Sequence, residues 1–174
     1  MTPTNTGANP FWNFSLALYA LDGVAPACLE LQETAGIDVN LLLYCSWRAW
    51  QGIALEPADL QAVDAAVSAW REDVVQPIRV LRQQLRAYPG VEASRSLIKQ
   101  AELEAERVQQ QCMYQQSLSQ EAGVEAGVDK NGEMLEHNLQ QFAAFQGIEI
   151  ASLAEFCRLA KRGFRGLKTD LFVR

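Results

Sequence analysis

Apolar side chains recur along this chain at the three- and four-residue spacing of helices, and no stretch shows the strict alternation of a β-strand. Asn9 followed by Pro10 predicts a helix start, because the Asn side chain can accept from a free backbone amide and proline loses nothing at the first helical position. A first helix is expected over residues 10–21, and a second over residues 25–34 with Gly36 as its C-terminal cap. The residues expected to face inward are Phe11, Phe14, Leu18 and Leu21, followed by Cys28, Leu29 and Leu31.

The most apolar stretch is residues 39–50, which follow Asp38 as a predicted N-cap. Its first two turns have no continuous polar face, and a helix that is apolar all round is usually central to its domain. We therefore expect this helix to be the most buried element. Arg48 is expected at the solvated end of the helix, and the alternative is that its guanidinium lies over a neighbouring indole.

A long helical hairpin is predicted over residues 57–120. Apolar residues at helical spacing begin after Pro57, Pro77 removes one backbone hydrogen bond and favours a kink near Asp73, and the Pro89-Gly90 pair turns the chain. The expected inward positions are Leu60, Val63, Val67, Trp70, Val74, Ile78, Leu81, Leu85 and Tyr88 on the first arm, and Leu97, Ile98, Ala101, Ala105, Val108 and Cys112 on the second. The second arm is rich in glutamine and its apolar stripe thins beyond Cys112, so its far end is expected to be solvated, or else covered by a partner.

The last third contains a glycine-rich segment and two further helices. Residues 121–131 are expected to be a mobile loop, Asn131 to cap a helix over residues 132–146, and Ser152 with Glu155 to form a capping box for a helix ending near Arg162. The chain is thus predicted to be a single compact all-α domain of six or seven helices. Its expected parts are a disordered N-terminus (1–9), an aromatic-rich helical core (10–56), the long hairpin (57–120), the mobile loop (121–131), C-terminal helices (132–162) and a basic tail (163–174).

The composition limits the kinds of catalytic and metal-binding site that the chain can form. The chain has 49% hydrophobic and 21% charged residues, which is ordinary for a soluble globular protein, and neither a signal peptide nor a membrane span is evident, so a cytoplasmic location is expected. His137 is the only histidine and lacks the spacing of a di-iron, zinc or triad motif, and the Asp129-to-Gly132 segment fails the calcium-loop pattern. The four cysteines are expected to be buried free thiols. No catalytic residue, cofactor or metal site is predicted.

The charge distribution is uneven. Residues 158–174 carry six basic side chains against Asp170, a net charge of +5 on a remainder of −11. One interpretation is that these cations complement a helix end and the acidic body. The other is that they bind a partner, expected to be another protein, because the acidic balance opposes nucleic acid. The residues predicted for this surface are Arg158, Lys161, Arg162, Phe164, Arg165, Lys168 and Phe172.

Two function classes remain open from the residues alone. A non-enzymatic protein–protein interaction or regulatory module is the leading hypothesis, and the oligomeric state is left undetermined. The alternative is a helical enzyme or small-molecule binder with a pocket among the N-terminal aromatic helices. The residues that would line this pocket are Trp12, Tyr44, Trp47 and Arg48.

The segments FWNFSLALYALDGVAPACLELQ (residues 11–32) and GIDVNLLLYCSW (residues 36–47) resemble a bacterial family of short, uncharacterised helical proteins with a domain of unknown function, and residues 70–82 are also similar. The resemblance implies a cytoplasmic all-helical protein and brings no catalytic residues with it.

Overall fold

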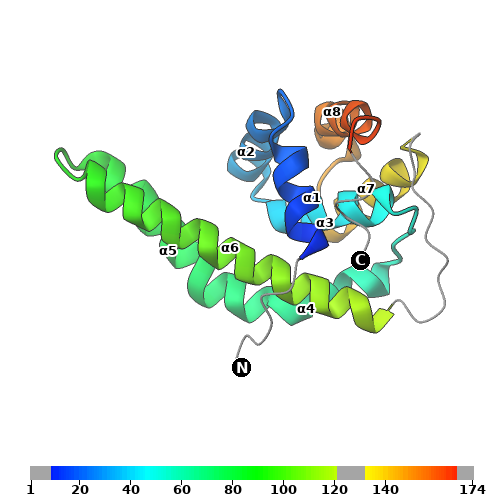
Figure 1. The fold of residues 1–174 in the computed structure, drawn as a ribbon, viewed down its shortest axis with the longest axis horizontal. Helices are drawn as coiled ribbons and strands as arrows, with labels where there is room; N and C mark the ends of the chain where they lie inside the picture. Colours follow the sequence, from blue (N-terminus) through cyan, green and yellow to red (C-terminus); the bar gives the residue numbers. More distant parts are fainter. Residues whose placement is uncertain (1–8, 121–131, 168–174) are drawn as a thin grey trace. The chain divides into compact units, whose positions relative to one another are not determined.

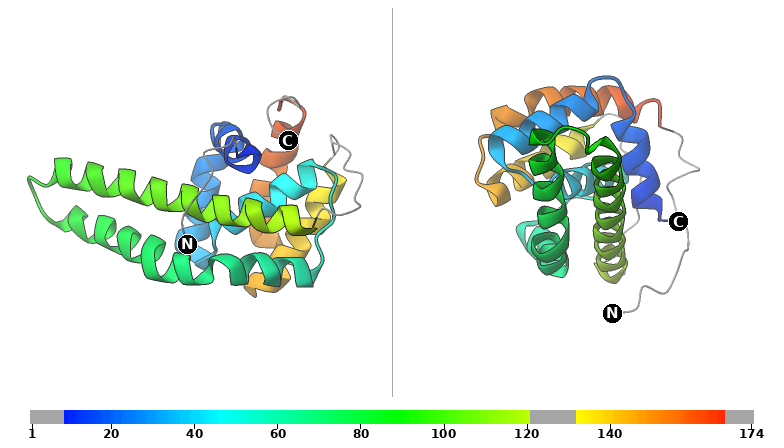
Figure 2. Two further views of the ribbon diagram at one scale, coloured as in Figure 1. Left: turned by 60° about the horizontal axis from the view of Figure 1, so that its bottom comes forward. Right: turned by 90° about the vertical axis from the view of Figure 1, so that its left-hand side faces the viewer.

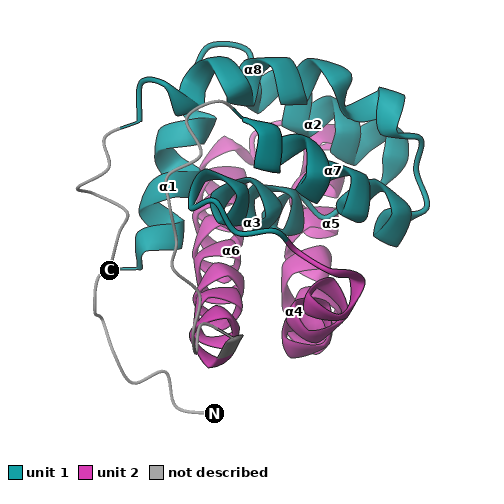
Figure 3. Cartoon of the chain, turned by 90° about the vertical axis from the view of Figure 1, so that its right-hand side faces the viewer, with its two compact units in different colours: residues 1–54, 125–174 teal, residues 55–124 magenta. Residues whose placement is uncertain are grey.

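The computed structural model describes residues 9–120 and 132–167. The described residues are helical throughout, with short connections and no strand, which confirms the all-α prediction (Figure 1). The chain divides into two compact units, Met1–Ala54 with Glu125–Arg174 and Leu55–Val124, coloured separately in Figure 3. The expected disordered residues 1–8, the mobile loop 121–131 with its Asn131 cap, and residues 168–174 of the tail lie outside the described residues.

The first unit begins with three short helices whose ends follow from local sequence signals. They are α1 (Pro10–Tyr19), α2 (Val24–Ala35) and α3 (Val39–Trp50). Asn9 Oδ1 accepts from the Trp12 amide at 3.1 Å, and Asp38 Oδ1 accepts from the Asn40 amide at 2.8 Å, so both predicted N-caps are confirmed. Gly36 ends α2 with a φ of 65°, a conformation that glycine adopts without steric cost.

Helix α3 is the centre of this unit. Every residue from Asn40 to Trp50 is buried, and α3 packs against α1 and α7 (Glu133–Gln146). Buried Asn138 of α7 donates from Nδ2 to the carbonyl oxygens of Cys45 at 3.2 Å and Ile53 at 2.9 Å. One polar side chain thereby joins α7 to α3 and to the turn that follows α3, in surroundings that are otherwise apolar.

The C-terminal helix α8 (Ala154–Phe164) follows a 3₁₀ turn, η3 (Ile150–Leu153), and packs against α2 and α7. The predicted capping box at Ser152 is wrong, because Ser152 lies within the 3₁₀ turn and its amide donates to the Glu149 carbonyl at 3.0 Å. The helix also runs past Arg162. A Cβ added at Gly163 would lie 2.1 Å from Cδ1 of Leu21, so the absence of a side chain at Gly163 permits the close approach of α8 to the end of α1.

The second unit is a helical hairpin. Its first arm contains α4 (Pro57–Trp70), a π-helical stretch η1 (Arg71–Val75), α5 (Gln76–Gln84) and a 3₁₀ turn η2 (Leu85–Ala87), and its second arm is α6 (Glu92–Gln120). The two arms run antiparallel, as both views of Figure 2 show.

The interruption predicted from Pro77 is observed as the π-helical stretch η1. Proline has no amide to donate to the carbonyl four residues earlier, so Pro77 leaves the helix without one α-helical bond. The preceding amide of Gln76 donates to the carbonyl of Arg71, which gives the wider turn around Asp73. Close to this point, Trp70 Nε1 donates to the Ala105 carbonyl at 2.9 Å and fastens the first arm to the second.

Burial corrects two predictions about the apolar faces. Leu29 is 47% exposed, so it does not face the core of its unit. On the hairpin, the predicted stripe is buried only near α4, while Leu81, Tyr88 and Leu97 are 43%, 64% and 65% exposed. The opposite end of α6, expected to be solvated, buries polar and apolar side chains alike: Gln109, Gln110, Met113 and Ser117.

Candidate functional site

Two of the four residues predicted to line a pocket, Tyr44 and Trp47, belong to a packed aromatic cluster. The ring of Phe11 lies 5.6 Å from that of Tyr44 in an edge-to-face arrangement and stacks on Trp47 at 5.2 Å. Tyr44 and Trp47 are fully buried, and Trp12 is half-buried. These rings occupy the space between α1 and α3, so they act as core side chains and a ligand at this place would have to displace them.

Arg48 differs from its predicted position. It is 2% exposed rather than at a solvated helix end, and its Cζ lies 5.5 Å from the centroid of the Trp47 ring. The alternative placement over an indole is therefore the observed one. Its Nη1 also donates to Gln51 Oε1 at 3.4 Å. The guanidinium thus forms a cation–π interaction with the indole ring.

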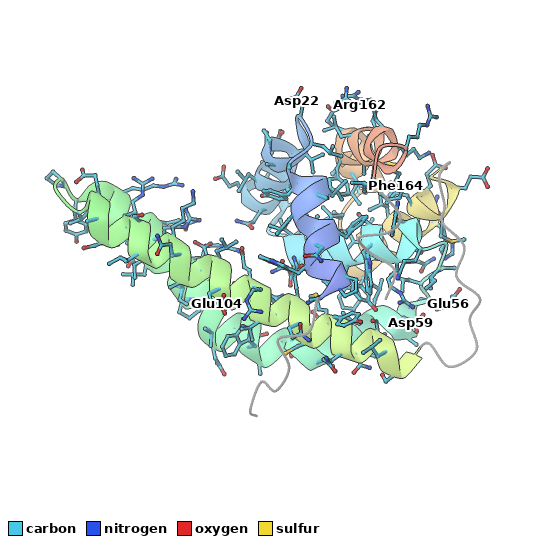
Figure 4. The ribbon with its side chains drawn as sticks, in the orientation of Figure 1. Asp22, Glu56, Asp59, Glu104, Arg162 and Phe164 are labelled. Carbon is cyan, nitrogen blue, oxygen red and sulfur yellow. The ribbon has the colours of Figure 1, made fainter. Side chains whose placement is uncertain are left out.

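The predicted C-terminal partner surface is only partly a surface. Phe164 is 1% exposed, and its ring lies 6.1 Å from that of Phe14, so it belongs to the core and is not free to bind a partner. Arg162 Nη2 donates to the carbonyl of Asp22 at 3.4 Å, and Figure 4 labels both residues.

The remaining cations of this surface are engaged locally or solvated. Arg158 makes an exposed two-point pair with Glu155 on the same helix, and Lys161 pairs with Glu136 of α7. Arg165 is exposed, and Lys168 and Phe172 lie outside the described residues. The interpretation that these cations complement their own unit therefore accounts for three of them.

Nucleophilic and metal chemistry has little support in the described part of the chain. Burial raises the pKa of the Cys28 thiol to about 12, and burial likewise raises the pKa of Cys45. Cys112 and Cys157 are half-buried, and burial raises their pKa values as well. Because the thiolate is the reactive form, none of the four thiols is activated. Among residues 9–120 and 132–167, no group of three or more His, Cys, Asp or Glu side chains is arranged to hold a metal ion.

A cluster of charges joins the two arms of the hairpin. Glu102 accepts from Nε of both Arg79, at 2.9 Å, and Arg82, and Arg79 also donates from Nη2 to Glu106 at 2.6 Å. The side chain of Glu102 is 8% exposed. Burial would by itself raise the pKa of Glu102, but the hydrogen bonds from Arg82 and Arg79 more than offset this effect, so its pKa lies below the ordinary glutamate value. We call these four residues the hairpin clamp.

Beyond the clamp, the hairpin exposes apolar side chains. Five of the nine large apolar side chains that are exposed in the described residues lie within the 80–103 segment: Val80, Leu81, Tyr88, Leu97 and Leu103. The segment around them is basic, since residues 76–101, which we call the outer hairpin, contain five cations and a single acid, Glu92. Apolar patches with charged borders are typical of interaction surfaces.

Sequence reasoning missed this surface because it assigned the outer leucines to a core face. The signal that could have found it is the charge of the segment, because residues 76–101 carry a net +4, and the chain outside this segment and the C-terminal basic segment carries −15. A helical face that combines exposed apolar residues with an excess of cations is typical of a surface exposed to an anionic partner.

The fold and these surfaces define an all-α protein made of an aromatic helical unit and a clamped helical hairpin. The chain belongs to a family described as protein of unknown function (DUF2390), whose model matches residues 10–113. This match runs from α1 through the outer hairpin and ends within α6, before the C-terminal basic residues. Neither the curated proteins nor the solved structures contain a match to the chain.

None of the described helices is long and apolar enough to cross a bilayer by itself; only α1 and α2 taken as a pair, bent by 97°, meet the length and composition that a span requires.

Proposed function

We propose that this protein is a non-enzymatic protein-binding module and that the outer hairpin is its binding surface. The observation that carries the proposal is the concentration of exposed large apolar side chains between Val80 and Leu103, whereas the other unit buries most of its large aromatic side chains. Exposing such side chains costs hydration free energy, and a partner that covers them recovers it.

The clamp supports this proposal because it explains how the surface is held. Because α5 has no buried residue, apolar packing does not hold it firmly against α6. The hydrogen bonds of Glu102 with Arg79 and Arg82 join the two helices next to the exposed leucines. A binding surface on helices that are fixed relative to each other loses less conformational entropy when the partner arrives.

Site-specific photocrosslinking in native cell extract tests the proposal. A photoreactive amino acid in place of Leu81 or Leu97 should give discrete protein adducts, which excess unlabelled wild-type protein should compete away. The matched control is the same substitution at Leu29, an exposed leucine of the other unit that is 47% exposed. Equal adduct patterns from Leu29 and Leu97 would show that the hairpin has no special role.

A shortened chain separates the hairpin from the basic tail. Removal of residues 168–174 should leave the adducts of Leu97 unchanged, because the proposed surface lies within the outer hairpin. Loss of these adducts in the shortened chain would move the binding surface to the C-terminus.

A further inference from the structure

The outer hairpin has two flanks, and one of them is apolar along both arms. Arg79 and Arg82 face Glu102 across the seam, which fixes the inward direction of each helix. Successive residues of a helix are rotated by about 100°. Counted from the seam in two antiparallel helices, Leu81 and Leu97 therefore project to the same side. Two further residues lie on this side, and we call the set the apolar flank: Leu81, Leu85, Leu97 and Ala101.

The opposite flank is different. It carries Val80 and Leu103, and seven residues after Leu103 on the same face of α6 lies Gln110, which is 2% exposed. The most exposed large apolar side chain of the described residues, Leu97 at 65%, lies on the apolar flank.

Unpaired cations border the apolar flank. The clamp neutralises Arg79 and Arg82, but Arg86 and Arg95 are exposed and make no ion pair within the described part of the chain. By position on their helices, Arg86 and Arg95 continue the seam beyond the clamp, so like charges approach each other there. An anionic group between them would remove this repulsion.

We infer, building on the proposed function, that the partner presents an acidic amphipathic helix that docks along the apolar flank. Two antiparallel helices form a groove that accepts a third, and such helices are anchored by apolar residues at positions i, i+3 or i+4, and i+7. Leu81, Leu85, Leu97 and Ala101 provide the apolar contacts, while Arg86 and Arg95 pair with carboxylates of the docked helix.

Other occupants fit these features less well. A nucleic acid would use the cations and leave the leucines uncovered. A bilayer favours a broad apolar face with aromatic residues at the interface, and the apolar flank has only aliphatic residues. A second copy docking through the same surface would bring two basic outer hairpins together, which like-charge repulsion opposes.

The test uses the full-length protein and synthetic 18-residue peptides in fluorescence anisotropy. The first peptide has leucines at helical spacing with glutamates on both edges; the second has the same composition in scrambled order, and the third has lysines in place of the glutamates. The first should bind at least about tenfold more tightly than either of the others, and its affinity should fall as salt is added. Equal binding of the three peptides would overturn the inference.

Variants assign the binding to its residues. The pair Arg86→Glu with Arg95→Glu, and separately Leu97→Ser, should each weaken binding about tenfold. Arg165→Glu and Leu29→Ser, matched exposed positions of the other unit, should change it less than about twofold. Circular dichroism confirms that each variant is folded, and Arg95→Gln provides a milder variant should the double charge reversal unfold.

Further arms distinguish the other occupants. Binding to mixed-sequence DNA and RNA tests for a nucleic acid, binding to vesicles containing phosphatidylglycerol tests for a membrane, and sedimentation of the protein alone tests for a second copy. Preferential binding in any of these measurements would overturn the inference. The proposed function has its own readout: crosslinked adducts at Leu97 without affinity for the acidic peptide would refute the acidic helix and leave the protein-binding module standing, whereas the absence of both would refute the two together.

Discussion

The two compact units hold their helices together by different chemistry. In the first, α3 is buried on all sides, and the rings of Phe11, Phe14 and Trp47 pack with those of neighbouring helices. In the second, α4 buries apolar residues, but α5 has no buried residue. The hydrogen bonds of the Glu102 clamp join α5 to α6. Apolar burial stabilises in proportion to area, whereas a partly exposed ion pair contributes little and depends on pH and salt.

On the proposed function, this chain assigns stability to one unit and recognition to the other. The aromatic unit places its large side chains where they stabilise the fold, and the outer hairpin leaves its leucines at the surface, where they stabilise little. We therefore expect substitutions of buried residues in the aromatic unit to lower the free energy of unfolding strongly, and substitutions of the exposed leucines of the outer hairpin to change it little.

Truncation of the aromatic core should have the largest effect. Phe142 of α7 is fully buried, so Phe142→Ala should lower the free energy of unfolding by about 3–5 kcal/mol through lost burial and the cavity left behind. This loss is measured by urea unfolding, monitored through the labelling of Cys45, because that buried thiol reacts only when the unit opens. Phe145→Ala, which removes a half-buried ring on the same helix, should cost clearly less; equal costs would contradict the described burial.

The sequence predicts the aromatic unit well because its signals are local. Asp38, Gly36 and the apolar run of α3 each act within one helix, and these three features are observed. In the hairpin, Pro77 likewise acts through a single missing amide, and the resulting interruption is observed. Leu29 and Leu97 were assigned to the core because periodicity identifies an apolar face without revealing whether another element covers it.

The same limit applies to the candidate site. Phe164 was placed in a basic tail because its neighbours are charged, but it packs on Phe14, which is 150 residues away in the chain. Gly163 shows no sequence signal for its role, since that role depends on the position of Leu21. Contacts between distant segments decide these cases, and no pattern within one helix reports them.

The next effect concerns a buried polar link inside the aromatic unit. Asn138→Ala should lower the free energy of unfolding by about 1–3 kcal/mol, because the buried carbonyls of Cys45 and Ile53 lose the donor that Nδ2 supplies. Thermal unfolding measures the change. Gln140→Ala, at an exposed position of the same helix, should stay within about 0.5 kcal/mol of wild type. A comparable loss in both variants would mean that the hydrogen bonds of Asn138 do not set the cost.

The clamp should give an effect of intermediate size that depends on pH. Glu102→Gln leaves Arg79 and Arg82 without their shared carboxylate and should destabilise the hairpin by about 1–2 kcal/mol at neutral pH, less than for a deeply buried pair because the arginines are partly solvated. The pKa of Glu102 is lower in the folded protein than in the unfolded chain, so this contribution is complete above the unfolded pKa and is lost as the pH falls through the folded pKa.

Unfolding of wild type and variant should therefore converge as the solution is acidified below the ordinary glutamate range. The readout is urea unfolding across this pH range, monitored by circular dichroism. The matched control is Glu104→Gln, which removes an exposed pair with Arg107 on the same helix, labelled in Figure 4, and should change stability by less than about 0.5 kcal/mol at every pH. A difference between wild type and Glu102→Gln that persists unchanged in acid would show that the clamp's charge does not stabilise the hairpin.

The smallest effect is expected where the sequence predicted a core. Leu97→Ala and Leu81→Ala should each change the free energy of unfolding by no more than about 0.5 kcal/mol, because these side chains bury little area in the free protein. Val67→Ala, at a fully buried position of α4, is the internal reference and should cost several times as much. If the two leucines cost as much as Val67, they would be structural and the hairpin would stabilise itself by the same apolar burial as the aromatic unit. A near-neutral result would instead leave recognition as the role that their exposure favours.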